Sequence, residues 1–352
     1  MNAVRRNREL DLLCETVRAS DAVAAVGART LWEVGGTIEP GFTPVHAPVG
    51  IERFDPRELT VTVAAGTTVA ELAATLAADG QECPLDPRDP TATVGGVLAA
   101  GLSGPRRLRH GPLRDRVLEV HFVNADGRII KAGGPTVKNV TGFDLPRLLV
   151  GSLGTIGVIT QVILRCQPLP STAEWCTTSI DPREVRRRLF RPSCVAWDGE
   201  VTSVLLEGVR DDIERERRAI DAVPTVVAPP YPDGPHRGRV SVRPGAVLDL
   251  GDQLRRIDGV RWLGELGVGT VHVATDTEAA LGEARTAAAT VGGWLLREAG
   301  APGLDGFGMT SPNAALLARV RDAFDPTHKF GRGRLDTVMK SNAHVEIEGV
   351  RG

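Results

Sequence analysis

Glycine is concentrated between Pro84 and Pro170, and this is where the chain is best suited to bind phosphate through its backbone. The glycines there are Gly95, Gly96, Gly101, Gly104, Gly111, Gly127, Gly133, Gly134, Gly142, Gly151, Gly154 and Gly157. Because glycine has no side chain, several backbone N–H groups can converge on one anion. The chain has no G-x-x-x-x-G-K-[ST] motif and no G-x-G-x-x-G between a strand and a helix. A P-loop enzyme is therefore excluded, and a Rossmann dehydrogenase is disfavoured.

The cysteines do not form a metal-binding or disulfide pattern. They are Cys14, Cys83, Cys166, Cys176 and Cys194, and no two of them have C-x-x-C spacing. Their number is odd and their spacing is irregular, so a zinc site, an iron–sulfur cluster and a disulfide framework are unsupported. We therefore expect no metal in this chain.

The overall composition is that of a globular protein of two domains. The chain has 352 residues, and domains usually contain roughly 100–200 residues. The formal net charge of −2 gives no reason to expect nucleic acid or an anionic membrane as a partner. Met1–Leu10 has arginines but no apolar core, and no apolar run is long enough to span a bilayer. We therefore expect no transmembrane segment and a cytoplasmic location.

The N-terminal part predicts helices and strands in alternation. Leu10, Leu13, Cys14 and Val17 form the apolar stripe of a first helix. Strands are expected at Ala22–Val26, Gly50–Phe54 and Thr60–Ala64. Thr68 and Glu71 form a capping box that opens a helix with Val69, Leu72, Ala73 and Leu76 facing inward. Asp79-Gly80 should end that helix.

The glycine-rich region predicts strands, and a second domain follows it. The strands are expected at Val117–Val123, Arg128–Lys131 and Val158–Leu164, the first two joined by a hairpin at Asn124–Gly127. Pro168–Pro170 marks a boundary. Beyond it, strands at Val201–Leu206 and Val268–Ala274 alternate with helices at Asp211–Val223 and Thr277–Ala289. This alternation predicts an α+β domain with an antiparallel sheet, and a last helix is expected at Asn313–Phe324.

Four segments together match a known family. They are Thr91–Arg107, Gly111–Asp115, Lys138–Asp144 and Gly151–Ile159. In this order and spacing they resemble the FAD domain of the vanillyl-alcohol-oxidase (PCMH-type) family of FAD-linked oxidases. GLSGPRR, KNVTGFD and GSLGTIGVI are similar to the branch that includes the FAD-binding second subunit of bacterial glycolate oxidase. The resemblance covers Ala22–Pro170 and, less completely, Phe324–Leu335.

The resemblance implies an α+β fold and a cofactor. Residues 1–170 would form a PCMH-type FAD-binding domain of two subdomains with a boundary near residues 84–90. Residues 171–324 would form an α+β cap domain with an antiparallel sheet that receives the substrate. Residues 325–352 would return toward the FAD domain and then end in a flexible tail. FAD is expected to bind non-covalently.

The resemblance also implies a set of cofactor-binding residues. They are Gly27, Ala28, Arg29, Thr30, Thr93, Gly95, Gly96, Ala99, Gly101, Ser103, Arg109, His110, Asp115, Gly154, Thr155, Gly157, Val158 and Ile159. Thr93, Gly95 and Gly96 would approach the pyrophosphate and ribityl chain through their backbone. The alternative is that these glycines only form a tight turn. The stretch from Ser103 to Asp115 would pass close to the flavin.

Some positions depart from the family pattern or have two interpretations. The family's first loop aligns with Val26–Thr30, where only Gly27 and a hydroxyl residue are retained. Arg29 either bonds a phosphate oxygen or is a surface arginine. His110 is favoured as a hydrogen-bonded loop histidine over a covalent flavin anchor. Lys138 and Asp144 could pair with each other. The family's Phe-Asn-Pro-Gly-Arg signature appears as Phe330–Arg334, with Asn and Pro replaced.

The resemblance implies oxidation of a small 2-hydroxy acid. A carboxylate substrate requires an arginine, and its hydroxyl proton requires a base. The candidates are Arg334 and His272, although a histidine in an apolar strand is more often part of the core. The implied partners are a larger FAD subunit and an iron–sulfur subunit. Two alternatives remain, a stand-alone FAD oxidase of another alcohol or sugar and a non-catalytic assembly subunit.

Overall fold

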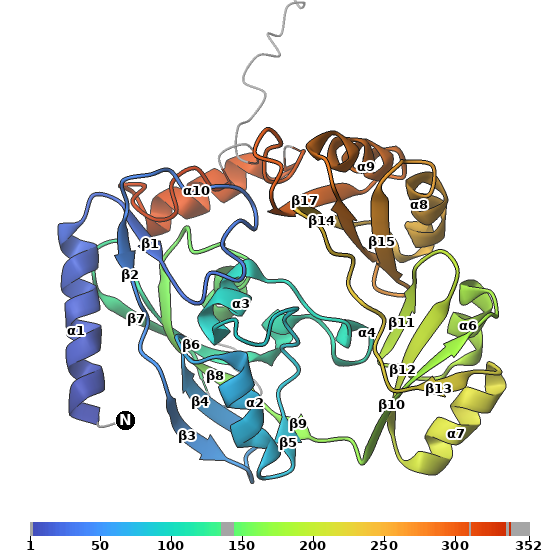
Figure 1. The fold of residues 1–352 in the computed structure, drawn as a ribbon. Coiled ribbons are helices and arrows are strands. Elements are labelled where there is room, and N and C mark those ends of the chain that lie inside the picture. Colours follow the sequence, from blue (N-terminus) through green and yellow to red (C-terminus); the bar gives the residue numbers. More distant parts are fainter. Residues whose placement is uncertain (1–2, 135–143, 310, 336–337, 339–352) are drawn as a thin grey trace, which may run out of the picture.

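The computed structural model describes residues 3–134, 144–309, 311–335 and 338. It contains two lobes that face each other (Figure 1). One lobe holds the N-terminal and glycine-rich parts of the chain, and the other is built on one large sheet. The helix α10 (Ala314–Phe324) and the segment after it lie with the N-terminal lobe.

The first helix packs on the edge of the N-terminal lobe. The helix α1 (Ala3–Ala19) buries Leu13 and Val17, as its apolar stripe predicts. The strand β1 (Val23–Ala25) pairs in parallel with β2 (Thr43–Val45), which the sequence did not indicate. On its other side Val23 pairs with Phe330, which is fully buried. The C-terminal segment therefore holds β1 in place.

A five-stranded antiparallel sheet forms the centre of this lobe. Its strand order is β3-β4-β8-β6-β7. The bounds are β3 Ile51–Asp55, β4 Thr60–Ala64, β6 Val117–Val123, β7 Ile129–Gly133 and β8 Val158–Arg165. These strands and the hairpin between β6 and β7 confirm the sequence predictions within two residues at each end. A small sheet of β5 (Gln81–Glu82) and β9 (Gln167–Pro168) lies beside it.

Two helices close the apolar core against this sheet. The helix α2 (Val69–Ala77) is capped by the Thr68 hydroxyl, which accepts from the Glu71 N–H. Leu72 and Leu76 are buried, but Ala73 is exposed, so its predicted inward position is wrong. The helix α3 (Val94–Ala100) was not expected as a helix, because a Val-Gly-Gly start has low helix propensity. The hydroxyl of Thr93 caps it by accepting from the Gly96 N–H.

Three short helices complete the glycine-rich region. They are α4 (Arg107–His110), the 3-10 helix η1 (Leu113–Arg116) and α5 (Leu145–Leu149). The Asp144 side chain caps α5 by accepting from the Arg147 N–H. Lys138 lies outside the described residues, so its predicted pairing with Asp144 stays a prediction.

The second lobe is an eight-stranded antiparallel sheet, as its alternating pattern predicts. The strand order is β13-β10-β12-β11-β15-β16-β14-β17. The bounds are β10 Thr172–Thr178, β11 Cys194–Trp197, β12 Thr202–Gly208, β13 Val223–Thr225, β14 His236–Ser241, β15 Val260–Glu265, β16 Thr270–Thr275 and β17 Trp294–Ala299. Every neighbouring pair is antiparallel.

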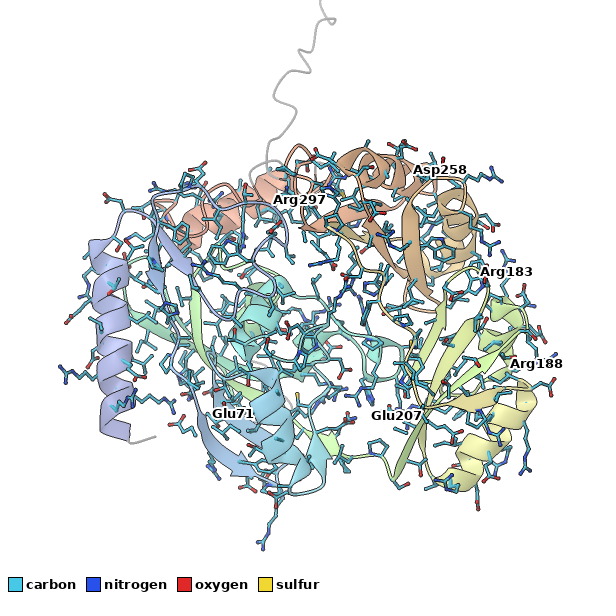
Figure 2. All side chains as sticks on the ribbon, viewed as in Figure 1. Glu71, Arg183, Arg188, Glu207, Asp258 and Arg297 are labelled. Atoms are coloured by element: carbon cyan, nitrogen blue, oxygen red, sulfur yellow. The ribbon has the colours of Figure 1, made fainter. Side chains whose placement is uncertain are left out.

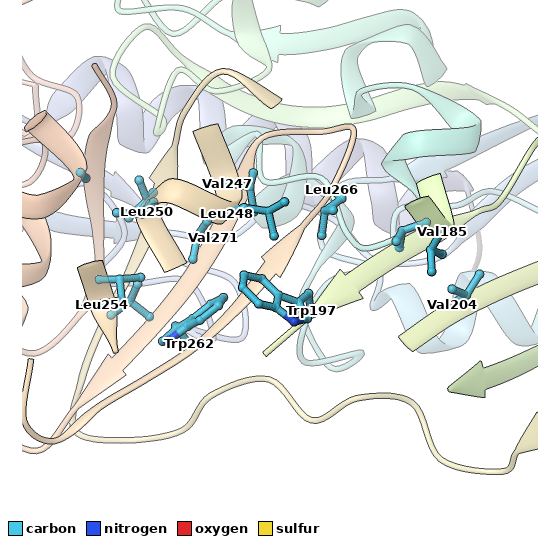
Figure 3. Close-up of a cluster of buried hydrophobic side chains, with 14 of the residues drawn as sticks. Val185, Trp197, Val204, Val247, Leu248, Leu250, Leu254, Trp262, Leu266 and Val271 are labelled. Atoms are coloured by element: carbon cyan, nitrogen blue, oxygen red, sulfur yellow. The ribbon is translucent and has the colours of Figure 1, made fainter. Parts of the chain in front are cut away.

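Helices cover the outer face of this sheet (Figure 1). They are α6 (Pro182–Arg188), α7 (Arg210–Ala219), the 3-10 helix η2 (Pro244–Ala246), α8 (Val247–Leu254) and α9 (Glu278–Thr290). The core between them includes Trp197 and Trp262, whose rings meet edge to face at 5.1 Å (Figure 3). The opposite face of the sheet points toward the N-terminal lobe and bears charged residues.

A partly buried ionic cluster joins the two lobes. Arg106 pairs with Asp86 through two hydrogen bonds of 2.8 and 2.7 Å, and with Glu82 at 2.6 Å. It also pairs at 3.1 Å with Glu207, which lies on β12 (Figure 2). Burial alone would raise the pKa of Glu207, but hydrogen bonds from His110 and Ser193 and the charge of Arg106 outweigh burial and lower it to about 2. The cluster fixes the loop before α4 against the second sheet.

We expect the Glu207→Gln substitution to destabilise the protein in a pH-dependent way. The folded-state pKa of Glu207 is depressed, so its contribution is present above the ordinary glutamate pKa and is lost as pH falls toward about 2. The variant should lose up to ~3 kcal/mol of unfolding free energy at neutral pH and much less at about pH 3. Urea denaturation at both pH values measures this. Glu214, a partly exposed residue that pairs with Arg218 on the surface, gives a control variant, Glu214→Gln, that should change little. An equal loss of unfolding free energy at both pH values would show that the stabilisation does not come from the ionised Glu207 carboxylate.

Candidate functional site

Three segments that are far apart in the sequence line one cavity of the N-terminal lobe. They are the loop after β1, the start of α3 and the turn before β8, together with Gly331 and Arg334. Including its open mouth, the cavity has a volume of about 900 Å³. We call it the glycine-lined cavity.

The first loop leaves consecutive backbone donors without a partner. In the described part of the chain, no hydrogen bond uses the N–H of Gly27, Ala28, Arg29 or Thr30. Arg29 adopts a left-handed conformation, with φ at 61°. Successive N–H groups around a left-handed residue form a concave anion-binding site. The loop therefore offers an anion site although it has lost two of the family's glycines.

The glycines let the segments approach each other without a side chain between them. A Cβ atom on Gly27 would lie 2.4 Å from Oγ1 of Thr93, and one on Gly95 would lie 2.8 Å from the Cβ of Ala65. Gly154 has φ of 71°, and a Cβ there would enter open space. These three positions require glycine for close packing and for backbone conformation.

The charge of the cavity wall favours an anionic ligand. Among the described residues that line it, Arg29 and Arg334 are basic and none is acidic. Both guanidinium groups lie by the Trp32 ring, at 5.2 and 5.5 Å from its centre. Arg334 donates to the carbonyls of Leu153 and Trp32, and its buried Nε has no partner. Burial lowers the pKa of Arg334 to about 10. Arg334 is therefore placed to bind a pyrophosphate. It also links the two loops that contain Leu153 and Trp32.

Most of the cofactor-binding residues expected from the sequence are brought together here. Those that line the cavity are Gly27, Ala28, Arg29, Thr30, Thr93, Gly95, Gly96, Ala99, Gly154, Gly157 and Ile159. Thr155 and Val158 are buried and do not line the cavity, and the Thr155 hydroxyl donates to the Ser152 carbonyl. Gly101 and Ser103 line neighbouring cavities instead. Thr93, Gly95 and Gly96 form a helix start rather than the tight strand turn considered as an alternative.

Arg109, His110 and Asp115 do not line this cavity, unlike most of the other residues expected to bind the cofactor. Arg109 donates to the carbonyl of Glu207 at 2.7 Å, and His110 contacts the Glu207 carboxylate at 3.2 Å. Asp115 pairs with Arg147 at 3.0 Å. The second lobe therefore holds Arg109 and His110 through Glu207, an interaction over about 100 residues that the local sequence does not show.

The ionic cluster also brings possible metal ligands together, but it does not need a metal. Atoms of Glu82, His110 and Glu207 lie within 4.8 Å of one another. Arg106 pairs with both glutamates, so a positive charge already occupies the space between them.

A second cavity lies between the two lobes and touches the first at Thr30 and Leu31. We call it the arginine-lined cavity, and its polar walls include Arg88, Arg237, Arg239, Tyr231, His272, Ser103, Asp86, Asp89 and Glu298. His272 lines it, whereas Arg334 lines the first cavity, so the two catalytic candidates are separated. Nε2 of His272 is 3.1 Å from the buried Glu265 carboxylate, and the Tyr231 ring meets His272 edge to face. Burial and then Glu265 raise the pKa of Tyr231.

A third, smaller cavity adjoins both of the others. It shares Arg239 with the arginine-lined cavity and Ala100 and Leu153 with the glycine-lined cavity. Trp294 and Phe307 line it, with their rings stacked at 5.9 Å, and we call it the aromatic cavity. Arg239 was not among the residues expected from the sequence, although the alternation in Arg237-Gly238-Arg239-Val240-Ser241 indicates that both arginines share one face of a strand.

Comparison with known proteins identifies the cofactor-binding part. Residues 8–133 match the family model described as FAD binding domain. The chain contains an FAD-binding domain. The unpaired N–H groups and arginines of the glycine-lined cavity fit the pyrophosphate of FAD.

Several known proteins are similar in sequence to about a third of this chain. Glycolate oxidase subunit GlcE of Escherichia coli is 42% identical over 123 residues, which is 34% of this chain and 35% of that protein. D-lactate dehydrogenase of Archaeoglobus fulgidus is 45% identical over 104 residues, 30% of this chain and 24% of that protein. Glycolate oxidase subunit GlcD of Bacillus subtilis is 37% identical over 35% of this chain and 26% of that protein. The matched part thus spans about a third or less of these relatives.

Nearly the whole chain has the same fold as a protein of known structure. Alkyldihydroxyacetonephosphate synthase has a TM-score of 0.64 and 15% identity, and the match covers 93% of this chain and 75% of that one. The α+β PCMH-type fold that the sequence predicts is therefore confirmed. In the described residues, no helix is both long and apolar enough to cross a bilayer.

The Gly27→Ala substitution should weaken FAD binding. The new methyl group would meet the hydroxyl of Thr93 that caps α3, so the first loop and α3 must move apart. We expect the Kd for FAD to rise at least about 10-fold, equivalent to ~1.4 kcal/mol. Fluorescence titration of the apoprotein with FAD measures this. Gly245→Ala is the matched control, because a Cβ there meets nothing within 4 Å. Equal FAD affinity in the two variants would contradict the close-packing argument.

Proposed function

We propose that this chain is the FAD-binding subunit of a glycolate oxidase-like 2-hydroxy-acid oxidoreductase. The observation that supports it most is that the FAD-binding domain places its cavity directly beside two cavities that share an unpaired, buried arginine, Arg239. The similarity to named glycolate oxidase subunits and to a D-lactate dehydrogenase supports the substrate class. When bound, FAD supplies a hydride acceptor for the α-carbon of a hydroxy acid.

The chain's own residues would bind the cofactor and position the substrate. The N–H groups of Gly27 to Thr30 and the guanidinium of Arg334 would hold the pyrophosphate. Gly154, Gly157 and Ile159 would lie along the adenine or flavin edges through their backbone. The domain division at residues 170 and 324 follows from the same proposal, with the second lobe as the cap that closes over the substrate.

His272 is our candidate for the base that accepts the hydroxyl proton. Its Nε2 lies 3.1 Å from Glu265 Oε1, so the tautomer in which Nε2–H donates to the carboxylate leaves a lone pair on Nδ1. A histidine oriented by a buried carboxylate is a common arrangement for general base catalysis. His272 is 8% exposed and lines the arginine-lined cavity. It is therefore a cavity residue rather than a packed core histidine.

Electrons would leave this chain for oxygen or for a partner protein. The Escherichia coli relative is named as a subunit, which supports a hetero-oligomer. We infer a larger FAD subunit and an iron–sulfur subunit as partners, and a cytoplasmic complex. Full glycolate turnover by the isolated chain would contradict the need for partners and would favour a stand-alone oxidase.

Anaerobic addition of glycolate or D-lactate to the purified, FAD-loaded chain should bleach its visible flavin absorption. His272→Asn should slow this reduction by about 10²–10⁴-fold while FAD stays bound, because the base is lost. The control is His121→Asn. His121 also contacts a buried glutamate, Glu119, at 2.8 Å, but it lines none of the three cavities.

The other outcomes separate the alternatives. A flavin spectrum that stays oxidised with both acids would assign the chemistry to a partner subunit or to another substrate. A chain that cannot be loaded with FAD would be a non-catalytic assembly subunit, and the altered first loop would be the reason.

A further inference from the structure

The strand β14 directs alternate side chains toward the N-terminal lobe. Val240 is fully buried in the core under the helices, so its neighbours Arg239 and Ser241 face the other way. Arg239 lies directly opposite His272 on β16 and opposite Leu296 on β17. Residues opposite each other in an antiparallel pair have Cβ atoms about 5 Å apart. Arg239 and His272 are therefore neighbours on one wall.

Arg239 is a buried cation without an ionic partner. Its exposure is 5%, and it forms no ion pair with any residue that the structure describes. Its one side-chain hydrogen bond is to the Thr270 hydroxyl at 3.4 Å. A guanidinium has five N–H donors, and burying its charge without a partner costs free energy. The unsatisfied donors border the arginine-lined and aromatic cavities.

A second arginine faces the same space from the other lobe. Arg107 begins α4 and lines the aromatic cavity with Arg239. Its side chain makes no hydrogen bond or ion pair within the described residues. Burial and then the charge of Arg239 lower the pKa of Arg107. The charge of Glu265 acts in the opposite direction and raises the pKa of Arg107 by less. The Glu265 carboxylate is hydrogen-bonded to His272 and forms an ion pair with neither arginine. Two like charges converge here from separate lobes.

Apart from Ser241, the other side chains that line the aromatic cavity are apolar. Trp294 and Phe307 are stacked along it, and Leu102, Leu153 and Leu296 line its remaining walls. Leu153 also lines the glycine-lined cavity, so a ligand here would lie next to the cofactor site. Two guanidinium groups beside an aromatic wall match a molecule with one carboxylate and one hydrocarbon group.

We propose that Arg239 and Arg107 bind the carboxylate of a monocarboxylic acid whose hydrocarbon group packs against Trp294 and Phe307. The inference rests on the proposed function and narrows its substrate class to 2-hydroxy acids with an apolar substituent larger than that of glycolate. With the carboxylate on Arg239, the α-hydroxyl would lie on the side of His272, its cross-strand neighbour.

Calorimetric titration of the FAD-loaded chain with 3-phenylpropionate tests this site. The compound has the carboxylate and the aromatic group but no hydroxyl, so binding is measured without oxidation. Acetate is the comparison ligand and should bind at least about 10-fold more weakly, because it cannot contact the aromatic wall. Trp294→Leu should reduce this preference for 3-phenylpropionate. Equal affinity for the two acids would overturn the assignment of the aromatic wall.

Substitution of the arginines tests the carboxylate site. Arg239→Met should raise the Kd for 3-phenylpropionate about 10- to 100-fold, which is the value of a charge-assisted hydrogen-bonded pair. Arg107→Met should raise it by a smaller factor. Arg243→Met is the control, because Arg243 follows the same strand but is exposed. Unchanged affinity in both Arg239→Met and Arg107→Met would overturn the proposal.

The test remains decisive if one variant does not fold or if the proposed function fails. Arg239→Met removes a buried unpaired charge, so its melting temperature should be unchanged or higher. If it does not fold, Arg239→Lys can be used instead. Lysine retains the charge but cannot bind a carboxylate in a bidentate way, so the affinity for 3-phenylpropionate should still fall about 10-fold. Arginine-dependent binding without flavin reduction by any hydroxy acid would contradict only the proposed function. Flavin reduction that is unaffected by Arg239→Met would contradict only this inference.

Discussion

The glycine-lined cavity collects positive charge and unpaired donors that the protein itself does not neutralise. The N–H groups of Gly27 to Thr30 have no acceptor in the described chain, and Arg334 has no acidic partner there. Gly27, Ala28 and Arg29 are exposed, so these donors are open to solvent and an anionic ligand can bind them without displacing an acceptor of the protein. Much of the N-terminal lobe serves to hold these groups together. Phe330 supports β1 before the loop, and Thr93 caps the helix that packs against it.

The second lobe complements this site through the two faces of its sheet. One face is apolar and is covered by helices, with Trp197 and Trp262 in its core. The other face presents Glu207, Arg239 and His272 to the N-terminal lobe. Glu207 fixes the relative position of the lobes through Arg106, while Arg239 and His272 remain available to a ligand. Because successive side chains of a strand point to opposite faces, the polar residues of these strands lie at the boundary between the lobes.

Local features were predictable from the sequence, and long-range contacts were not. The strands β4 and β6 and the Thr68 cap follow from short-range patterns, and the structure has them at the expected residues. The glycines at 27, 95 and 154 also indicated the cavity. Gly154 meets a local backbone requirement, whereas Gly27 and Gly95 are required by close contacts with Thr93 and Ala65, which are distant in the sequence.

Contacts between distant segments could not be predicted from the local sequence. His110 is a hydrogen-bonded loop histidine, as favoured from the sequence, but its partner Glu207 is 97 residues away. The pairing of Arg239 with His272 depends on the register of β14 and β16. Hydrogen–deuterium exchange of the apoprotein and the FAD-loaded chain tests the central claim most directly. If the first loop binds the pyrophosphate, FAD should slow amide exchange in residues 27–30, 93–97 and 154–159. FAD binding that leaves exchange in residues 27–30 unchanged would contradict the account.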